Sequence, residues 1–255
     1  MASRDTDLDW QIIAENKPFW GVLSQPVYEP DALTEQSLEE FYQSGEVFVR
    51  NLYALVRAHL DPDFTPGRVF DFGCGVGRLL LPMARLSDEA LGVDIAPGML
   101  KLCSERAQAL GLTNVAVQQS DDSLADVNGP FDLVNSYITL QHIPPDRGLR
   151  LLETLIGKIA VGGIGSLQLT YGKGRGFFLH EQPQARFYRR HGDQLFDLCP
   201  TQHPQPPGHI TMYDYDLNSV FALVSLAAGH PVVTLPTNDD NHLGVHLIFK
   251  KARSA

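Results

Sequence analysis

Three glycines at every second position follow an acidic residue in VFDFGCGVGR, residues 69–78. Gly73, Gly75 and Gly77 stand between an apolar strand-like run and an apolar helix-like run, where a strand would turn into a helix. Glycine allows a tight turn and lets a ligand approach the main chain closely. The N–H groups at the start of the next helix favour a carboxylate or phosphate. The loop therefore predicts a ligand site.

Acidic residues recur at the ends of the next two apolar runs. Asp94 lies at the end of ALGVDI, and the pair Asp121 and Asp122 follows VAVQQS. A carboxylate at the first position suits the hydroxyls of a ribose, and one at the second suits an adenine amino group. Purely structural roles stay open for these residues. Asp94 also suits a helix N-cap before Pro97, and one of the paired aspartates could cap its own loop.

Alternating strand and helix patterns must position these residues. Strand patterns cover residues 68–73, 90–95, 115–120, 131–138 and 162–171, and helical patterns cover about 77–86, 97–110 and 145–160. This alternation predicts a mostly parallel sheet with helices on both faces. A helix over about 216–228 and two strands over 231–237 and 244–251 predict a final antiparallel pair. Ligands bind such sheets at the carboxyl ends of the strands, where the glycines and acids lie.

Two regions lie outside this alternation. Residues 1–34 look irregular, and the helical pattern over 34–60 contains Gly45, which could divide it. We expect residues 1–60 to form an N-terminal cap on a domain of residues 61–255. Within this cap, Trp20 and Tyr42 could contact a cationic ligand or simply pack. Residues 172–212 are irregular and predict an inserted lid, a solvated insertion or a dimer contact.

Composition excludes several functions. The 255 residues carry a net charge of −10, which argues against a general nucleic-acid surface. No apolar run is long enough for a membrane span and the N-terminus lacks a signal-peptide core, so we expect a soluble, cytoplasmic protein. Cys74, Cys103 and Cys199 are scattered and the histidines lack ligand spacing, so we expect no metal. A homodimer stays open.

Four motifs resemble those of class I S-adenosylmethionine (SAM)-dependent methyltransferases, in the same order: VFDFGCGVGR, ALGVDIAPGML, QQSDDSL and FDLVNSYITLQHIPP. The flanking segments PFWGVL, FYQSGEVFV and MYDYDLNSVFALVSLAAG resemble a bacterial group of these enzymes. The resemblance implies a doubly wound, Rossmann-like α/β fold of seven strands with an antiparallel last strand. It also implies methyl transfer from SAM to a small-molecule or glycan acceptor, at oxygen first and nitrogen second, with S-adenosylhomocysteine (SAH) as product.

From this resemblance and the residue types we expect two sets of contacts. The cofactor set is Asp71, Gly73, Cys74, Gly75, Gly77, Asp94, Ile95, Asp121, Asp122, Asn135 and Ser136. The acceptor set is Tyr137, Gln141, His142, Tyr171, Arg186, Arg189 and Arg190, and the arginines would form a mildly cationic lid suited to a sugar or an anionic small molecule. His142 is the candidate general base, although it could instead be satisfied by backbone and pin its loop.

Two further functions stay open. The chain could bind SAM or SAH without catalysis, as a regulatory or partner module. An NAD-dependent oxidoreductase would share Asp94, but Arg78 stands where the dinucleotide fingerprint needs its last glycine. Binding of SAM or of NADH distinguishes these functions.

Overall fold

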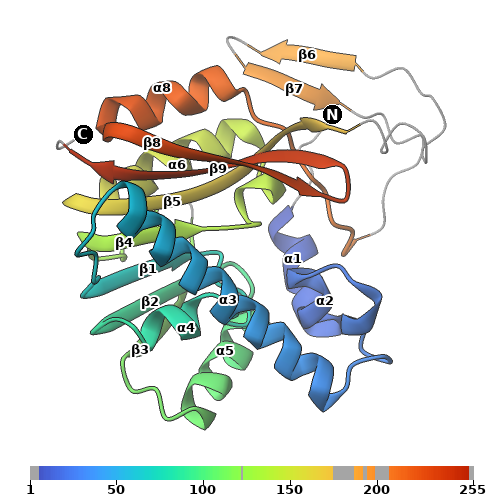
Figure 1. Cartoon of the computed structure of the whole chain (residues 1–255). Coiled ribbons are helices and arrows are strands. Elements are labelled where there is room, and N and C mark those ends of the chain that lie inside the picture. The colour runs from blue at the N-terminus through green and yellow to red at the C-terminus, as the bar shows by residue number, and fades with distance from the viewer. Residues whose placement is uncertain (1–5, 122, 175–186, 192–193, 199–206, 253–255) are drawn as a thin grey trace.

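A seven-stranded sheet forms the centre of the computed structural model, which describes residues 6–121, 123–174, 187–191, 194–198 and 207–252 (Figure 1). The strand order is β3-β2-β1-β4-β5-β9-β8. The strands are β1 (Arg68–Phe72), β2 (Glu89–Asp94), β3 (Val115–Gln119), β4 (Phe131–Ser136), β5 (Ile159–Lys173), β8 (Ala228–Asp239) and β9 (His242–Lys251). Strands β1 to β5 pair in parallel, and β9 is antiparallel to both β5 and β8. The predicted Rossmann-like fold is confirmed.

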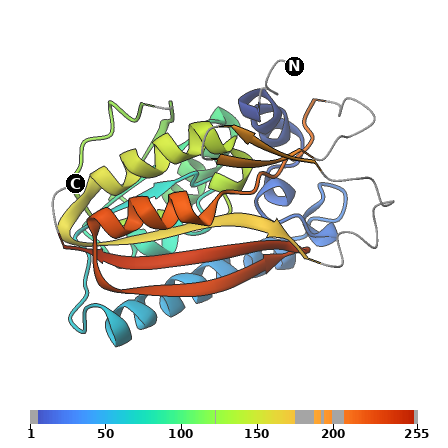
Figure 2. The ribbon, with the colours of Figure 1, turned by 90° about the horizontal axis from the view of Figure 1, so that it is seen from above.

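Helices cover both faces of this sheet. One face carries α3 (Glu35–His59), α4 (Leu80–Ala84) and α5 (Pro97–Ala109), and the other carries α6 (Pro145–Lys158) and α8 (Leu217–Ala227). Figure 2 shows α3 on one side of the strands and α6 and α8 on the other. Each face buries its own apolar cluster, because successive strand residues point to opposite faces.

The N-terminal segment is helical. It forms α1 (Thr6–Asn16), α2 (Pro18–Val22) and the short 3₁₀ helix η1 (Pro26–Tyr28), so the expectation of an irregular segment is wrong. The physical reason lies in α1, where two of the four buried residues, Thr6 and Asp9, are polar. An apolar period is therefore missing, and contacts with distant parts of the chain hold the helix in place.

Helix α3 continues without a break through Gly45, so the considered division at this glycine is wrong. A side chain at Gly45 would clash, since its Cβ would lie 1.9 Å from the carbonyl oxygen of Arg78. The glycine therefore lets α3 approach the glycine loop closely.

The inserted region is more regular than expected. Strand β5 extends to Lys173, and β6 (Phe187–His191) and β7 (Gln194–Leu198) form an antiparallel hairpin outside the main sheet. Two short strand-like runs separated by a Gly-Asp pair are a hairpin signal that the mixed composition of the region obscures. In the described part of the chain, no helix is both long and apolar enough to cross a bilayer.

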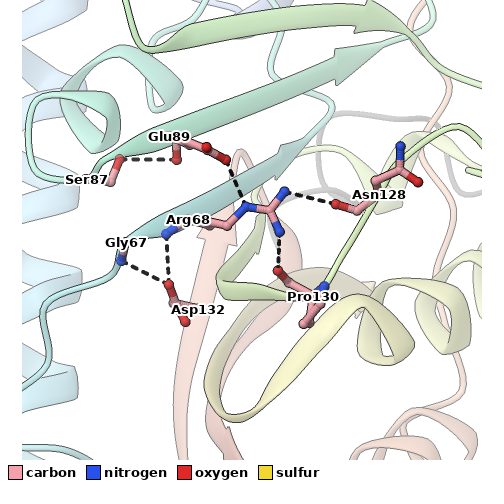
Figure 3. A network of polar contacts seen from close by, with 7 residues as sticks. All are labelled: Gly67, Arg68, Ser87, Glu89, Asn128, Pro130 and Asp132. Atoms are coloured by element: carbon pink, nitrogen blue, oxygen red, sulfur yellow. Dashed lines mark hydrogen bonds and ion pairs between the residues drawn. The ribbon is translucent and has the colours of Figure 1, made fainter.

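A network of hydrogen bonds joins the amino end of β1 to the amino end of β4 and the segment before it (Figure 3). The Arg68 guanidinium donates to the carbonyl oxygens of Pro130 and Asn128 at 2.8 and 3.1 Å. The Asp132 carboxylate accepts from the backbone N–H groups of Gly67 and Arg68 at 2.9 and 2.8 Å. These bonds fix the strand starts and so hold the opposite, carboxyl ends in register.

Candidate functional site

The glycine loop follows β1, and its Gly73 and Gly75 line a pocket, whereas Gly77, also predicted to contact the cofactor, does not. Gly73, Gly75 and Gly77 have φ values of 75°, 53° and 86°, which favour glycine. A Cβ at Gly73 would lie 2.2 Å from the Thr139 side chain, so a larger residue is excluded by space as well. The positive φ of Gly77 also explains why α4 begins at Leu80 and not near Gly77 as expected.

Asp94 ties this loop to α5. Its carboxylate accepts from the backbone N–H groups of Gly75 and Ala96, each at 2.9 Å. Burial raises the pKa of Asp94, while these bonds oppose that rise. The N-cap of α5 is Ala96, so Asp94 does not take the capping position considered as its alternative. Each carboxylate oxygen keeps a lone pair that can accept from a ligand.

The Asp121 carboxylate turns toward its own loop. It accepts from the backbone N–H and hydroxyl of Ser123 and from the N–H of Leu124, at 2.8 to 2.9 Å, and these bonds lower its pKa. The pocket is lined here by Ser120 and Ile95. Contact of Asp121 with adenine stays a prediction, and Asp122 lies outside the described residues.

Two opposite charges line the same pocket without forming an ion pair within the described residues. Asp71 is 3% exposed and receives a hydrogen bond of 2.8 Å from Asn135 Nδ2. Burial raises the pKa of Asp71 to about 7, opposed by that bond and by the Arg78 charge. Arg78 is 7% exposed and donates to Ser44 Oγ at 3.3 Å, and its Nε has no hydrogen-bond partner in the described part of the chain.

Arg78 lines the pocket but is outside the predicted set of site residues. In the sequence it stands out only as a departure from the dinucleotide fingerprint. A signal existed, because a residue directly after the last glycine of the loop must turn either into the pocket or toward the covering helix α3. In the structure Arg78 does both, since it lines the pocket and contacts α3 through Ser44.

His142 lies across the pocket in a short 3₁₀ helix η2 (Leu140–His142). Its Nδ1 lies 3.1 Å from the carbonyl oxygen of Thr211, so Nδ1 carries the hydrogen and Nε2 keeps a lone pair. Burial lowers the pKa of His142 to about 4, opposed by the bond to Thr211. One nitrogen thus anchors the loop, as the structural interpretation requires. The other is free of a proton and lies 3.5 Å from Nε2 of Gln141, whose amide can donate to it.

The remaining acceptor candidates are dispersed. Tyr137 lines the pocket, whereas Gln141 is buried beside it and accepts from Gln168 Nε2 at 3.2 Å. Tyr171 is 39% exposed on β5 and does not line the pocket. Arg189 and Arg190 are in β6, whose side chains are not described, and Arg186 lies outside the described residues. The arginine lid stays a prediction.

Two buried polar residues of β4, both predicted to contact the cofactor, lie behind the pocket wall. Asn135 and Ser136 are both fully buried and do not line the pocket themselves. Asn135 reaches it through Asp71, as described above. Cys74 does line the pocket, and its thiol is buried beside Cys103, which raises the Cys74 pKa and favours the inert thiol form.

Helices α1 and α2 cover the pocket. Asp7 and Trp10 of α1 line it, with Trp10 packed edge-on against His142 at 4.9 Å between ring centroids. The Asp7 carboxylate accepts two hydrogen bonds from Arg147 of α6, at 2.7 and 2.9 Å. Trp20 and Tyr42 do not line the pocket, so the packing interpretation fits them. Within the described residues, no group of three acidic, histidine or cysteine side chains could hold a metal.

The part of the chain that carries the glycine loop is similar to known methyltransferases. Residues 69–163 match the family model described as a methyltransferase domain. A ubiquinone biosynthesis O-methyltransferase of Xanthomonas axonopodis is 36% identical over 103 residues, which are 40% of this chain and 42% of that protein. A release factor glutamine methyltransferase of Rhodospirillum rubrum is 45% identical over 74 residues, which are 28% of this chain and 22% of that protein. The chain thus spans less than half the length of these relatives.

A solved structure extends the likeness to the rest of the chain. Magnesium protoporphyrin IX methyltransferase from Synechocystis, with bound SAH, superposes with a TM-score of 0.60 at 17% identity, over 94% of this chain and 99% of that one. At this identity the match shows the fold. Residues 69–163 thus match the model of a methyltransferase domain, and the chain as a whole has the Rossmann-like α/β fold of that solved structure.

Proposed function

We propose that this chain is a SAM-dependent methyltransferase that acts on a small-molecule or glycan acceptor, at oxygen. The observation that carries the proposal is the pocket itself. Two glycines that leave the main chain open, a carboxylate at the end of β2, and two opposite charges that form no ion pair within the described residues line one cavity. An adenosyl amino acid offers a ribose diol, a zwitterion and a sulfonium, which match these groups.

Arg78 and Asp71 support the binding of a zwitterion. Arg78 would bind the carboxylate of SAM and Asp71 would bind its ammonium group, because each is a buried charge aimed into the pocket. Asp94 would accept from the two ribose hydroxyls, and Ile95 would pack against adenine. The residues present therefore fit the cofactor, which supplies an electrophilic methyl group when bound.

The acceptor would lie between the glycine loop and α1. The walls there are Trp10, Ile143 and Tyr137, with His142 among them. Such a wall suits a ring or short apolar body that presents one nucleophilic atom. His142 Nε2 would take the proton of an acceptor hydroxyl, while alignment against the loop would supply much of the rate.

The relatives support oxygen as the acceptor atom but leave nitrogen as the second candidate. One matching relative is named an O-methyltransferase and another a glutamine methyltransferase, although both match the same region. The matched region therefore correlates with the cofactor and not with the acceptor. Acceptor choice would depend on α1, α2 and the segments after β5.

Isothermal titration with SAM, and with NADH as the comparison ligand, tests the proposal first. We expect SAM to bind and NADH to give no heat. A panel of phenols, sugars and amines with methyl-labelled SAM then tests catalysis. Labelled product that depends on His142 supports the transferase, whereas SAM binding without product from any acceptor supports the non-catalytic module. Binding of NADH alone would refute the assignment.

A further inference from the structure

A line of polar side chains crosses four neighbouring strands under the α3 face of the sheet. Asp71 of β1, Asn135 of β4, Ser166 of β5 and His246 of β9 are 3%, 0%, 0% and 4% exposed. Two positions from each polar residue, toward the opposite edge of the sheet, the same face carries an apolar residue. These residues all belong to the cluster under α3 and are Val69, Leu133, Ile164 and Ile248. The strand period of two therefore aligns the polar residues on one face.

Hydrogen bonds join the four residues into one chain. Asn135 Nδ2 donates to Asp71 Oδ1 at 2.8 Å, and Ser166 Oγ donates to Asn135 Oδ1 at 2.8 Å. Ser166 Oγ also lies 2.8 Å from His246 Nε2. The register supports this path, because Asp71 pairs with Asn135 and Asn135 pairs with Ser166 across adjacent strands.

The direction of the hydrogen bonds follows from the chemistry of the groups. The Asn135 amide oxygen can only accept, so the single hydroxyl hydrogen of Ser166 is used there. His246 Nε2 must then carry a hydrogen and donate to Ser166 Oγ. Each donor in the chain therefore points toward Asp71, and such a sequence polarises its members cooperatively.

Aromatic packing holds His246, which lies at the far end of this series of hydrogen bonds from Asp71. The His246 ring stacks on Phe48 of α3 at 5.9 Å and packs edge-on against Tyr137 at 5.2 Å. Burial lowers the pKa of His246 to about 4, so the ring is neutral at pH 7 and its orientation is fixed by the stack. The charged groups that act on Asp71 are Arg78 and Asp94.

We propose that His246, acting through Ser166 and Asn135, is a positioning residue of the ligand site that holds the Asp71 carboxylate in place for the ammonium group of SAM. His246 does not line the pocket; it reaches Asp71 through this hydrogen-bond chain, and it also packs edge-on against Tyr137, which lines the pocket. The inference rests on the proposed function, since Asp71 faces an ammonium group only if SAM binds there.

The first test compares SAH affinity in matched variants by isothermal titration. His246→Phe keeps a stacking ring without the donor and should weaken SAH binding about 3- to 10-fold, as should Ser166→Ala. His246→Gln, which restores an N–H donor, should recover at least half of that loss. In the Asp71→Asn background, His246→Phe should change affinity less than about twofold, since the chain then ends on a neutral amide. Equal losses in both backgrounds would overturn the proposal, because separated sites without coupling are additive.

The second test uses no ligand and so distinguishes failure of this inference from failure of the proposed function. Nitrogen-15 NMR of the free protein should show His246 as the Nε2–H tautomer. Carbon-13 NMR of the Asp71 carboxyl should show its titration at higher pH in His246→Phe than in the parent, because a donor chain favours the ionised form. An Nδ1–H tautomer, or an Asp71 titration unchanged by the substitution, would refute the chain even if SAH binds.

Discussion

Two buried cations lie at opposite ends of the sheet and have very different partners. Lys251, beside the amino end of β5, donates to three main-chain carbonyl oxygens at the end of α6, at 2.9, 3.0 and 3.3 Å. Arg78, at the carboxyl end of β1, has a bond of 3.3 Å to Ser44 and an Nε without a partner in the described residues. Both cations are less than 8% exposed.

The carboxylates at the two ends of the sheet differ in the same way as the cations, being well paired at the amino ends and less so at the carboxyl ends. At the amino ends, Asp132 accepts two backbone N–H groups, and Arg68 is paired with Glu89 at 2.9 Å as well as with two carbonyl oxygens (Figure 3). At the carboxyl ends, burial raises the pKa values of Asp71 and Asp94. The amino end is thus closed by its own hydrogen bonds. The carboxyl end keeps buried charges that a ligand can satisfy, and this difference separates scaffold from site.

The largest expected effect is at the carboxyl end. Asp94→Ala should weaken SAM binding about 100-fold or more. The carboxylate would no longer accept from the two ribose hydroxyls, and its hydrogen bond from the Gly75 N–H would be lost as well. Titration calorimetry measures the loss. The control is Asp94→Asn, whose amide keeps one acceptor oxygen and should lose less. An affinity unchanged in Asp94→Ala would mean that the ribose lies elsewhere.

The next effect is at the amino end and concerns stability alone. Lys251→Met should lower the free energy of unfolding by about 2–3 kcal/mol, because three carbonyl oxygens at the end of α6 lose their donor. SAM affinity should stay within about twofold of the parent value. Urea unfolding followed by circular dichroism measures the first quantity. A lost affinity in this variant would show that the two ends are not independent.

Arg78→Met should show the opposite behaviour. We expect SAM affinity to fall about 10- to 30-fold, because one charge-assisted contact with a carboxylate is removed. Unfolding free energy should stay unchanged or rise, since the arginine is a buried charge with few partners in the described residues. Arg85→Met, an exposed arginine on the same segment of chain, is the control. Strong destabilisation without loss of affinity would assign Arg78 to the scaffold.

The smallest effect concerns pH. Burial raises the pKa of Asp71 to about 7, so its contribution to stability is present below about pH 4 and is lost as pH rises through 7. Asp71→Asn should therefore gain stability relative to the parent as pH rises from 4 to 8, because the amide does not ionise. Thermal unfolding at both pH values checks the sign. A variant that loses stability relative to the parent over this range would show that the ionised carboxylate is well satisfied without a ligand.

Sequence predicted the sheet, its helices and the glycine loop, because their signals are local. The period of apolar residues marks each strand, and three glycines at alternate positions after a strand indicate a tight turn that leaves the main chain open to a ligand. Helix α1 was missed because its contacts are distant in sequence. Asp7 is paired with Arg147, and Asp9 accepts from the N–H of Gly208.

The sequence predicts individual residues of the site but not the contacts that join the site to the rest of the sheet. Asp71, Asp94 and His142 were identified from their places at strand ends, and all three line the pocket. Arg78 and His246 were not identified, because only the fold shows that one enters the pocket and that the other joins it across three strands. A polar residue at an inward strand position, as in GVHLIFKK, is the signal that could have indicated His246.

The carboxyl end of the sheet should hold the zwitterion of SAM between Asp71 and Arg78. Calorimetric titration of the unaltered protein with SAH, at about pH 6 and pH 7.5, tests it most directly because the ligand ammonium stays charged over most of this range. Binding should be tighter at the higher pH, because Asp71 ionises, and this gain should be absent in Asp71→Asn. Absence of binding at both pH values, or a gain that survives in Asp71→Asn, would contradict it.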